Sequence, residues 1–337
     1  MPDAYVAALL NSYNAPVLVG NADLDEVFVY TKGKHAGNMA DTAAARIAQA
    51  RLLWHLRQLR FDDVVLAEPT YTPRNIRMAQ FILSGPWLGG RRAGTRIGGF
   101  EHDDGVSAGL DVVASKAGMD GLHMAQIIMR LANAYGIATD PASTPACRVV
   151  PPAGPSRGGA RALIGLHISA RKPSQRWPVE RFAALVERLG AQYDVGFRVL
   201  WSPGDEHNSL HPGDDQKAAA FERTLDAANG EKQPIEISFV TTTRLDQLIG
   251  ALAEVDMMIC ADGGAMHLAA GLGKPVVALF GDSDPVRWRP WMVNNRVLQP
   301  ASLDVSEIAV GEVLQAVREL IVECGFGAHF AQFEGIN

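Results

Sequence analysis

The sequence predicts an α/β protein built from two doubly wound parallel-sheet domains. Short β-branched and apolar runs alternate with longer segments of helical period, which is the pattern of β-α-β units. The alternation recurs in both halves of the 337-residue chain. Residues 141–160 are rich in proline and glycine and can form neither a helix nor a strand core. We therefore expect one domain over 1–140, a linker over 141–160 and a second domain over 161–304.

Each half supplies strands and helices in alternation. In the first half we predict strands at 27–30, 64–67 and 95–100, and helices near 38–60, 74–83 and 121–135. In the second half we predict strands at 162–168, 197–202, 235–240, 256–261 and 275–281, and helices that begin near Pro178, Asp214, Leu245 and Ala265. An amphipathic helix over 306–323 and an aromatic tail complete the segment 305–337, which we expect to pack back on the first domain.

Composition and charge exclude several classes of protein. With 47% hydrophobic and 20% charged residues, the chain is too apolar to be disordered. A net charge of -6 provides no positive field for a nucleic acid. The sequence has no long apolar run and no basic leader, so we expect a cytoplasmic protein without a transmembrane segment. Its three cysteines form no CxxC pair, which predicts neither disulfides nor a metal site, and we expect no cofactor.

The most informative motif is DMMICADGGAMHLAAGLGKPVVALFG, residues 256–281. A strand ends near Ala261, Asp262-Gly263-Gly264 forms a turn, and a helix follows. A helix N-terminus beyond a parallel strand attracts anions, and glycines allow a phosphate to approach the backbone. The alternative is a plain β-α turn in which Asp262 caps the helix. His267 is either a phosphate ligand or a buried, satisfied histidine.

Two common nucleotide-binding signatures are absent from the sequence. Lys274 is followed by proline rather than serine or threonine, so the motif is not a Walker A loop, and no GxGxxG follows a first strand. These absences disfavour P-loop ATPases and simple NAD-dependent oxidoreductases.

A second motif, GLHISARKPSQRWPVERFAALVERL at 165–189, places a basic loop after a strand. Ser169, Arg171, Lys172 and Arg176 offer the hydroxyl and cations that a diphosphate leaving group needs when no metal neutralises it. The alternative is an ordinary solvated loop. Trp177 is predicted to be a packing anchor for the next helix rather than a platform for a base.

Further charged residues follow other strands. Glu206 lies beyond the strand at 197–202, where a carboxylate can accept hydrogen bonds from ribose hydroxyls, although such a loop is commonly only a solvated turn. Arg91, Arg92 and Arg96 cluster in the first domain. They either receive an acidic acceptor or form a surface patch.

With these residues the chain resembles glycosyltransferase family 9, the ADP-heptose:lipopolysaccharide heptosyltransferases. The most specific elements are ADGGAMHLAAGLGKPVVALFGDSDPVRWRPW and SARKPSQRWPVERFAAL. The resemblance implies a GT-B architecture, two Rossmann-like domains facing across a cleft. It also implies an inverting, metal-independent transfer of heptose from ADP-heptose to the anionic lipopolysaccharide inner core, at the cytoplasmic face of the inner membrane.

Site residues follow from the resemblance by matching position. Ser169 and Lys172 would face the diphosphate, with Arg176 as the alternative source of the main charge. The ribose would lie against Glu206. The phosphate-binding turn would comprise Asp262, Gly263, Gly264 and His267.

The chain departs from the family pattern at its start. Family members open with a strand, a glycine-containing loop carrying an Asp thought to be the catalytic base, and a helix, and this unit has no counterpart here. We therefore expect a shortened chain, another base or an inactive member, with Glu68 as the first alternative base. An exposed sheet edge or apolar groove should result. Two further hypotheses are a GT-B transferase for another nucleotide sugar and a nucleotide-binding homologue without transferase activity.

Overall fold

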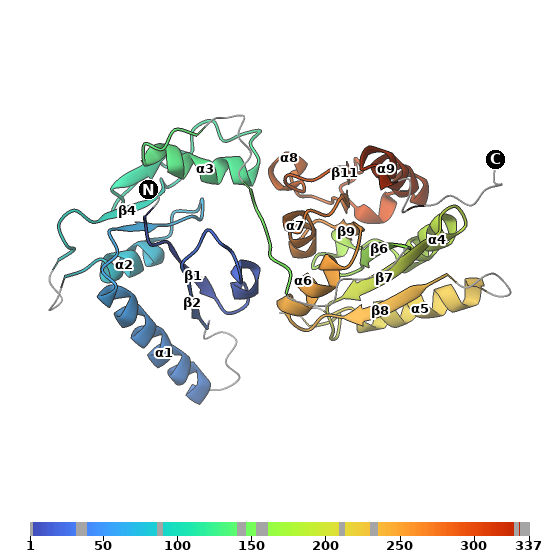
Figure 1. Ribbon diagram of the computed structural model, residues 1–337, viewed down its shortest axis with the longest axis horizontal. Helices are drawn as coiled ribbons and strands as arrows, with labels where there is room; N and C mark the ends of the chain where they lie inside the picture. Colours follow the sequence, from blue (N-terminus) through green and yellow to red (C-terminus); the bar gives the residue numbers. More distant parts are fainter. Residues whose placement is uncertain are drawn as a thin grey trace. The chain divides into compact units, whose positions relative to one another are not determined.

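The structure is a computed structural model that describes residues 3–31, 39–85, 90–139, 146–152, 161–208, 213–229, 235–326 and 330. The chain forms two compact α/β units, coloured blue to green and green to red in Figure 1. One unit comprises residues 1–15 and 22–146, and the other comprises 16–21 and 147–337. No helix in the described ranges is long and apolar enough to cross a membrane.

The second unit is organised by a six-stranded parallel sheet. In chain order its strands are β6 (Ala162–His167), β7 (Val195–Trp201), β8 (Ile237–Thr241), β9 (Met257–Ala261), β10 (Val276–Leu279) and β11 (Asn295–Leu298). Their order across the sheet is β11-β10-β9-β6-β7-β8. The chain therefore proceeds in one direction from β6 to β8 and in the other from β9 to β11. The reversal lies between β6 and β9, where open parallel sheets bind ligands beyond the carboxyl ends of the strands.

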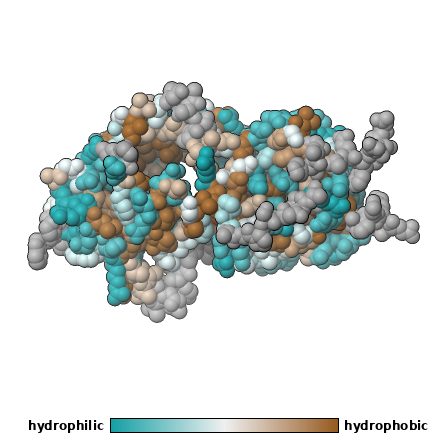
Figure 2. Space-filling model, viewed as in Figure 1, coloured by the Kyte–Doolittle hydropathy of each residue, from teal (hydrophilic) through white to brown (hydrophobic). Residues whose placement is uncertain are grey.

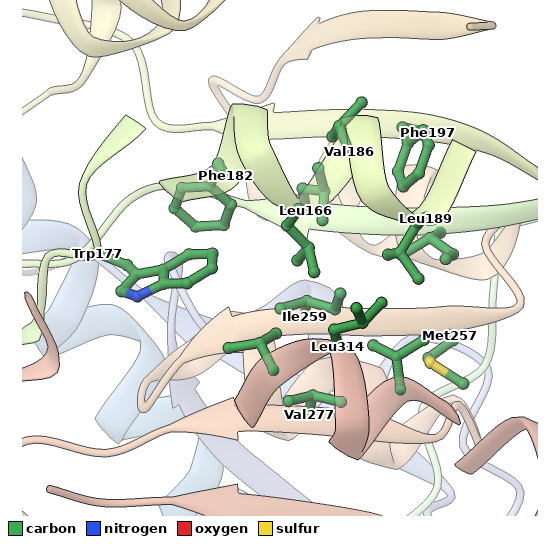
Figure 3. Packing of buried hydrophobic residues seen from close by; sticks show 14 of the residues in the cluster. Leu166, Trp177, Phe182, Val186, Leu189, Phe197, Met257, Ile259, Val277 and Leu314 are labelled. Carbon is green, nitrogen blue, oxygen red and sulfur yellow. The ribbon is translucent and has the colours of Figure 1, made fainter. Parts of the chain in front are cut away.

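Helices cover both faces of this sheet. The core on one face contains residues of α4 (Val179–Gly190), α5 (Asp215–Asn229) and α9 (Val310–Glu323), and the core on the other contains residues of α6 (Leu245–Ala253) and α7 (Gly264–Gly271). Figure 3 shows side chains of α4, α9 and the central strands meeting in the first of these cores. Burial of both faces explains why the strand sequences are continuous apolar runs rather than alternating ones.

Trp177 confirms its predicted role as a packing anchor. The indole is 2% exposed, and its ring meets Phe182 edge-on with centroids 4.7 Å apart. Its Nε1–H donates to the carbonyl of Ile308 at 2.9 Å, which satisfies the one polar atom of the buried ring. The side chain thus connects the start of α4 to the segment before α9, and it leaves no open face for a nucleobase.

The first unit contains two separate parallel sheets. One pairs β1 (Ala7–Asn11) with β2 (Glu26–Tyr30), and the other has the order β3-β4-β5, with β3 at Asp63–Val65, β4 at Arg96–Phe100 and β5 at Val112–Ala114. Among the described residues, β1 and β3 each pair on one side only. The end strands β8 and β11 of the second unit also pair on one side only, so the exposed sheet edge or apolar groove expected from the sequence stays a prediction.

Three helices accompany these sheets: α1 (Met39–Gln58), α2 (Pro73–Ile82) and α3 (Met124–Ala134). One small cluster joins Phe28 of β2 and Leu56 of α1 to the partly buried Leu9 and Val64 of β1 and β3. The packing is thin, since Trp54 of α1 remains 54% exposed. Figure 2 shows hydrophobic side chains, in brown, at the surface of this unit, on the left.

Short elements complete the chain. Among the described residues, 3-10 turns lie at Ala15–Leu18 (η1), Pro173–Gln175 (η4) and Val305–Glu307 (η5), and a one-turn helix, α8, lies at Pro285–Trp288. The carboxylate of Asp304 accepts a hydrogen bond from the Ser306 N–H at 2.9 Å, which forms η5 and delays the start of α9 relative to the predicted helix at 306.

The linker and tail are described in part. Val149 donates its N–H to the carbonyl of Gly271 at 2.8 Å, so this end of the linker belongs to the second unit. In the tail, Phe330 is buried against Tyr193 and Phe326, also within the second unit. The described part of 305–337, with α9 and Phe330, thus lies in the core of the second unit, and the expected packing of this segment on the first domain stays a prediction for its remaining residues.

We expect Phe182→Ala to lower the free energy of unfolding by about 3–5 kcal/mol, because it removes a buried ring that contacts Trp177 and Phe221. Urea unfolding followed by tryptophan fluorescence measures this loss. Val322→Ala is the control, since Val322 on α9 is 81% exposed and its truncation should change the stability by at most about 0.5 kcal/mol. Equal stabilities of the two variants would contradict the packing described.

Candidate nucleotide-binding site

The predicted donor-site residues of the second unit gather at one edge of its sheet. Because all six strands are parallel, their carboxyl ends share that edge. Ser169 follows β6, Glu206 follows β7, and the turn that leads to His267 follows β9. Since β6 pairs directly with β9, the loops after these two strands flank the reversal point of the sheet. This is the position where an open α/β sheet binds a ligand.

The turn between β9 and α7 presents an uncapped helix N-terminus. The N-cap residue is Gly263, and no side chain caps the helix, so Asp262 does not have the capping role that was the alternative. The first N–H groups of a helix have no acceptors within it and carry the positive end of the helix dipole. A Cβ placed on Gly263 or Gly264 would meet no protein atom within 4 Å. Open space therefore lies beside these donors, as an anion requires.

His267 occupies the first turn of α7 with its side chain accessible to solvent, not as a buried, satisfied histidine. Its ring lies edge-on to Trp288, with the centroids 6.1 Å apart. Partial desolvation lowers the pKa of His267, and the negative charge of Asp262 opposes that effect. Desolvation thus favours the neutral imidazole, whereas a bound anion would favour the imidazolium.

In the basic loop after β6, Lys172 is held in a close ion pair. The Lys172 ammonium contacts both carboxylate oxygens of Asp282, at 2.7 and 2.9 Å, and this ion pair lowers the pKa of Asp282. Both side chains are nearly half exposed, so the pair is accessible but its net charge is cancelled. Asp282 is a site residue that the sequence interpretation missed. Its position directly after Gly281, beyond a predicted strand, was the available signal.

Arg176 joins the loops after β6 and β7. Its Nε donates to the carbonyl of Ala170 at 3.0 Å, and its Nη1 lies 3.8 Å from a carboxylate oxygen of Glu206. The structure therefore brings Arg176 and Glu206 together, which the sequence did not predict. Between the two candidate cations, Arg176 has the looser carboxylate contact and retains more of its charge for a ligand.

Ser169 is held between two segments. The Ser202 N–H donates to its hydroxyl oxygen at 2.9 Å, and the hydroxyl also hydrogen-bonds the carboxylate of Asp214, which is 2% exposed. A contact between Ser169 and a diphosphate stays a prediction. Asp214 entered the sequence interpretation only as the start of a helix, because its partner lies far away in the chain.

The arginine cluster of the first unit is paired internally. Arg91 contacts the carboxylate of Asp111 through two bonds of 2.5 and 2.6 Å, and Arg96 contacts Asp63 at 2.8 and 3.1 Å. Arg92 donates to the carbonyl of Phe61. Two of the three guanidinium charges are thus offset by carboxylates, and acceptor binding by this cluster stays a prediction.

Glu68 is exposed beyond the carboxyl end of β3, and its role as a base stays a prediction. No group of three or more histidine, cysteine, aspartate or glutamate side chains with metal-binding geometry occurs among the residues that the structure describes.

A parallel sheet with a reversal point, an uncapped helix N-terminus and a basic loop is the arrangement of a Rossmann-like unit, a fold class that commonly binds nucleotides at this edge. Residues 139–306 match the model of glycosyltransferase family 9 (heptosyltransferase). This part of the chain belongs to that family.

The relatives identified by sequence match about two fifths to one half of the chain. Lipopolysaccharide heptosyltransferase 2 of Escherichia coli K12 is 31% identical over 146 residues, which are 43% of this chain and 38% of that protein. The protein of the same name from Salmonella typhimurium is 27% identical over 170 residues, 50% of this chain and 44% of that protein. The match thus spans about two fifths of the length of these curated relatives.

Solved structures share the fold over nearly the whole chain. A family 9 glycosyltransferase from Veillonella parvula superimposes with a TM-score of 0.67 at 19% identity, covering 96% of this chain and 89% of that one. E. coli ADP-heptose LPS heptosyltransferase II gives a TM-score of 0.65 at 20% identity, covering 96% and 92%. E. coli heptosyltransferase WaaC with ADP gives 0.63 at 13% identity, covering 93% and 99%. These comparisons establish the GT-B fold.

We expect Asp282→Asn to strengthen the binding of pyrophosphate roughly two- to fivefold, because it leaves Lys172 uncompensated beside the anion site. The gain should shrink at high salt, where exposed charges are screened. Calorimetry at two salt concentrations measures both effects. Glu319 of α9 forms a comparable exposed pair with Arg296 of β11, and Glu319→Gln should leave pyrophosphate binding unchanged. Weaker binding by Asp282→Asn would show that the carboxylate, not the ammonium, serves the ligand.

Proposed function

We propose that the protein is an inverting, metal-independent heptosyltransferase that transfers heptose from ADP-heptose to the inner core of lipopolysaccharide. The observation that carries the proposal is the uncapped, open N-terminus of α7 beside the reversal point of the sheet. Family membership of residues 139–306 supports the donor class. The names of the relatives, lipopolysaccharide heptosyltransferases, support the acceptor.

In this proposal the second unit binds the nucleotide sugar. The diphosphate lies at the Gly263-Gly264 turn, where free N–H groups and the helix dipole stabilise the charge that develops on departing ADP. His267 gains a proton as the anion approaches. Arg176 adds charge from the loop after β6, with Lys172 beside it in its pair with Asp282. Glu206 accepts hydrogen bonds from the ribose hydroxyls.

The transfer requires one nucleophilic displacement. A base removes the proton from an acceptor hydroxyl, the hydroxyl oxygen forms a bond to the anomeric carbon, and the bond from that carbon to the ADP oxygen breaks with its electron pair leaving on ADP. Attack from the face opposite ADP inverts the anomeric centre. Glu68 is the candidate base in the described first unit. Arg91, Arg92 and Arg96 are the candidate contacts for an anionic acceptor at the cytoplasmic face of the inner membrane.

A binding comparison followed by a turnover assay tests this function. ADP should bind in preference to UDP, and ADP-heptose with a lipopolysaccharide core acceptor should yield ADP and an extended core. Preference for UDP would indicate another nucleotide sugar. Binding of ADP without any turnover would identify a nucleotide-binding homologue, the hypothesis favoured by the divided sheet of the first unit.

We expect Gly264→Val to weaken ADP binding at least tenfold, or about 1.4 kcal/mol, because the side chain would fill the open space in front of the first-turn N–H groups. Isothermal calorimetry measures the affinity, and circular dichroism verifies folding. Gly311→Val is the matched control, since a Cβ at Gly311 on α9 also meets no atom within 4 Å. Unchanged ADP affinity in a folded Gly264→Val variant would refute the site.

We also expect chelation by EDTA to leave both ADP binding and sugar transfer unchanged, because protein N–H groups and cations meet the diphosphate charge. The measurement compares affinity and turnover in EDTA with those in magnesium. A loss in EDTA that magnesium restores would place the protein in a metal-dependent class of transferase.

A further inference from the structure

A pair of charged residues, Asp214 and Lys217, lies beneath the basic loop and has no role in the site described above. Asp214 precedes α5 and is 2% exposed, while Lys217 lies in the first turn of that helix and is half-buried. Removing charges from water is costly unless they are paired or hydrogen-bonded. Two such groups under one loop therefore call for an explanation.

Both residues contact consecutive positions of the chain just after β6. The Lys217 ammonium donates to the carbonyl of Ile168 at 2.7 Å, and the Asp214 carboxylate hydrogen-bonds the hydroxyl of Ser169. The Lys217 ammonium also lies 5.8 Å from the centroid of the Phe182 ring. The start of α5 thus contacts Ile168 and Ser169, the first two residues of the loop that leads to Arg176.

Ser169 has partners on two neighbouring segments. The Ser202 N–H donates to its hydroxyl oxygen, and the hydroxyl also interacts with the carboxylate of Asp214. Ser169 thus connects the loop after β6 to the segments that contain Ser202 and Asp214.

The cluster is not optimised for stability alone. Oδ1 of Asp214 is buried and makes no hydrogen bond in the described part of the structure. An unsatisfied buried acceptor costs free energy that an apolar residue at the same place would not. The burial of these charged groups is therefore better explained by their contacts with the loop after β6 than by a gain in stability.

We propose that Asp214 and Lys217 are positioning residues of the donor site, which orient Ser169 and the backbone at Ile168, and that Lys217 also places a positive charge beneath the bound diphosphate. This role rests on the proposed function. It makes nucleotide affinity depend on the charge of Lys217, although the nucleotide contacts neither residue.

The charges around the cluster determine how it titrates. Lys217 is influenced by Asp214, Arg176 and Glu180, and Asp214 is influenced by Lys217, Arg176 and Glu206. Burial lowers the pKa of Lys217 to about 8, against a partial opposing effect of Asp214, and burial raises the pKa of Asp214. Lys217 is thus charged at neutral pH and loses its proton within an accessible range.

Lys217 should produce two opposite pH trends. A bound anion favours the ammonium, so ADP affinity should fall as the pH rises through about 8. Stability should change in the other direction. The pKa of Lys217 in the folded state, about 8, lies below the ordinary lysine pKa of 10.5 that applies in the unfolded chain. The unfolded chain therefore binds more protons between these values, and folding stability should rise with pH across that window. A merely structural lysine would produce the second trend alone.

The test uses Lys217→Met, with Lys274→Met as its control. Lys274 also donates its ammonium to a backbone carbonyl, that of Ala253 at 2.8 Å, but it precedes β10 at the opposite edge of the sheet. Calorimetry of ADP binding and thermal unfolding are measured from neutral pH to above the pKa of Lys217. We expect Lys217→Met to bind ADP at least fivefold more weakly at neutral pH and to lose the decline through about pH 8. Lys274→Met should retain both.

Asp214→Asn provides an independent second variant. Asparagine still accepts the hydrogen bond from Ser169 but removes the charge that favours the Lys217 ammonium, so the midpoint of the affinity decline should move to lower pH. A merely structural role would give no decline of ADP affinity with pH in either protein.

The outcomes separate the two hypotheses. The positioning role would be overturned if the wild-type protein binds ADP and folded Lys217→Met has the same affinity and pH profile. That result would leave the proposed function intact. Failure of the wild-type protein to bind ADP would overturn the proposed function, and the positioning role with it.

Discussion

Pairing of β6 with β9 is the constraint on which the site depends. The register sets Ile164 opposite Met257 and His167 opposite Cys260, so the two strands end together although some ninety residues separate them. Strands that are buried on both faces cannot shift this register without exposing apolar side chains or losing ladder hydrogen bonds. The loop with Ser169 and the turn with Gly263 are consequently held side by side by the most deeply buried backbone of the unit. Loops of ordinary sequence acquire a fixed relative position from the sheet beneath them.

Ion pairs also fix the side chains of the loops at this edge of the sheet. Lys172 is matched with Asp282, and Arg176 approaches Glu206, so two cations of the loop are each held by a carboxylate that follows another strand of the sheet. Such pairs at half-exposed positions contribute little to stability. Their effect is to preset the directions of long side chains before a ligand arrives, which lowers the conformational entropy lost on binding. The cost is a weaker net positive charge, and this leaves the backbone N–H groups of α7 as the principal anion donors.

Local patterns in the sequence predicted the elements that are buried locally. The apolar runs of β6, β7, β9 and β10, the glycine turn and the packing of Trp177 all follow from short-range signals. The strands β1, β5 and β11 were missed because they are short or only half-buried, and their pattern does not stand out from loops. Asp282 and Lys217 were missed for a different reason. Their partners lie 110 and 49 residues away, so no spacing in the sequence reveals them.

The one-sided pairing of β1 and β3 has a consequence for how the chain unfolds. Amides on an unpaired strand edge exchange with solvent through small local openings, whereas those of β6 and β9 exchange only when the whole sheet opens. The two units therefore differ in their protection against hydrogen exchange and proteolysis, with the first unit opening at a lower free energy. A nucleotide bound only to the second unit stabilises that unit by mass action and leaves the openings at β1 and β3 as frequent as before. Ligand binding would thus widen the difference in protection between the units.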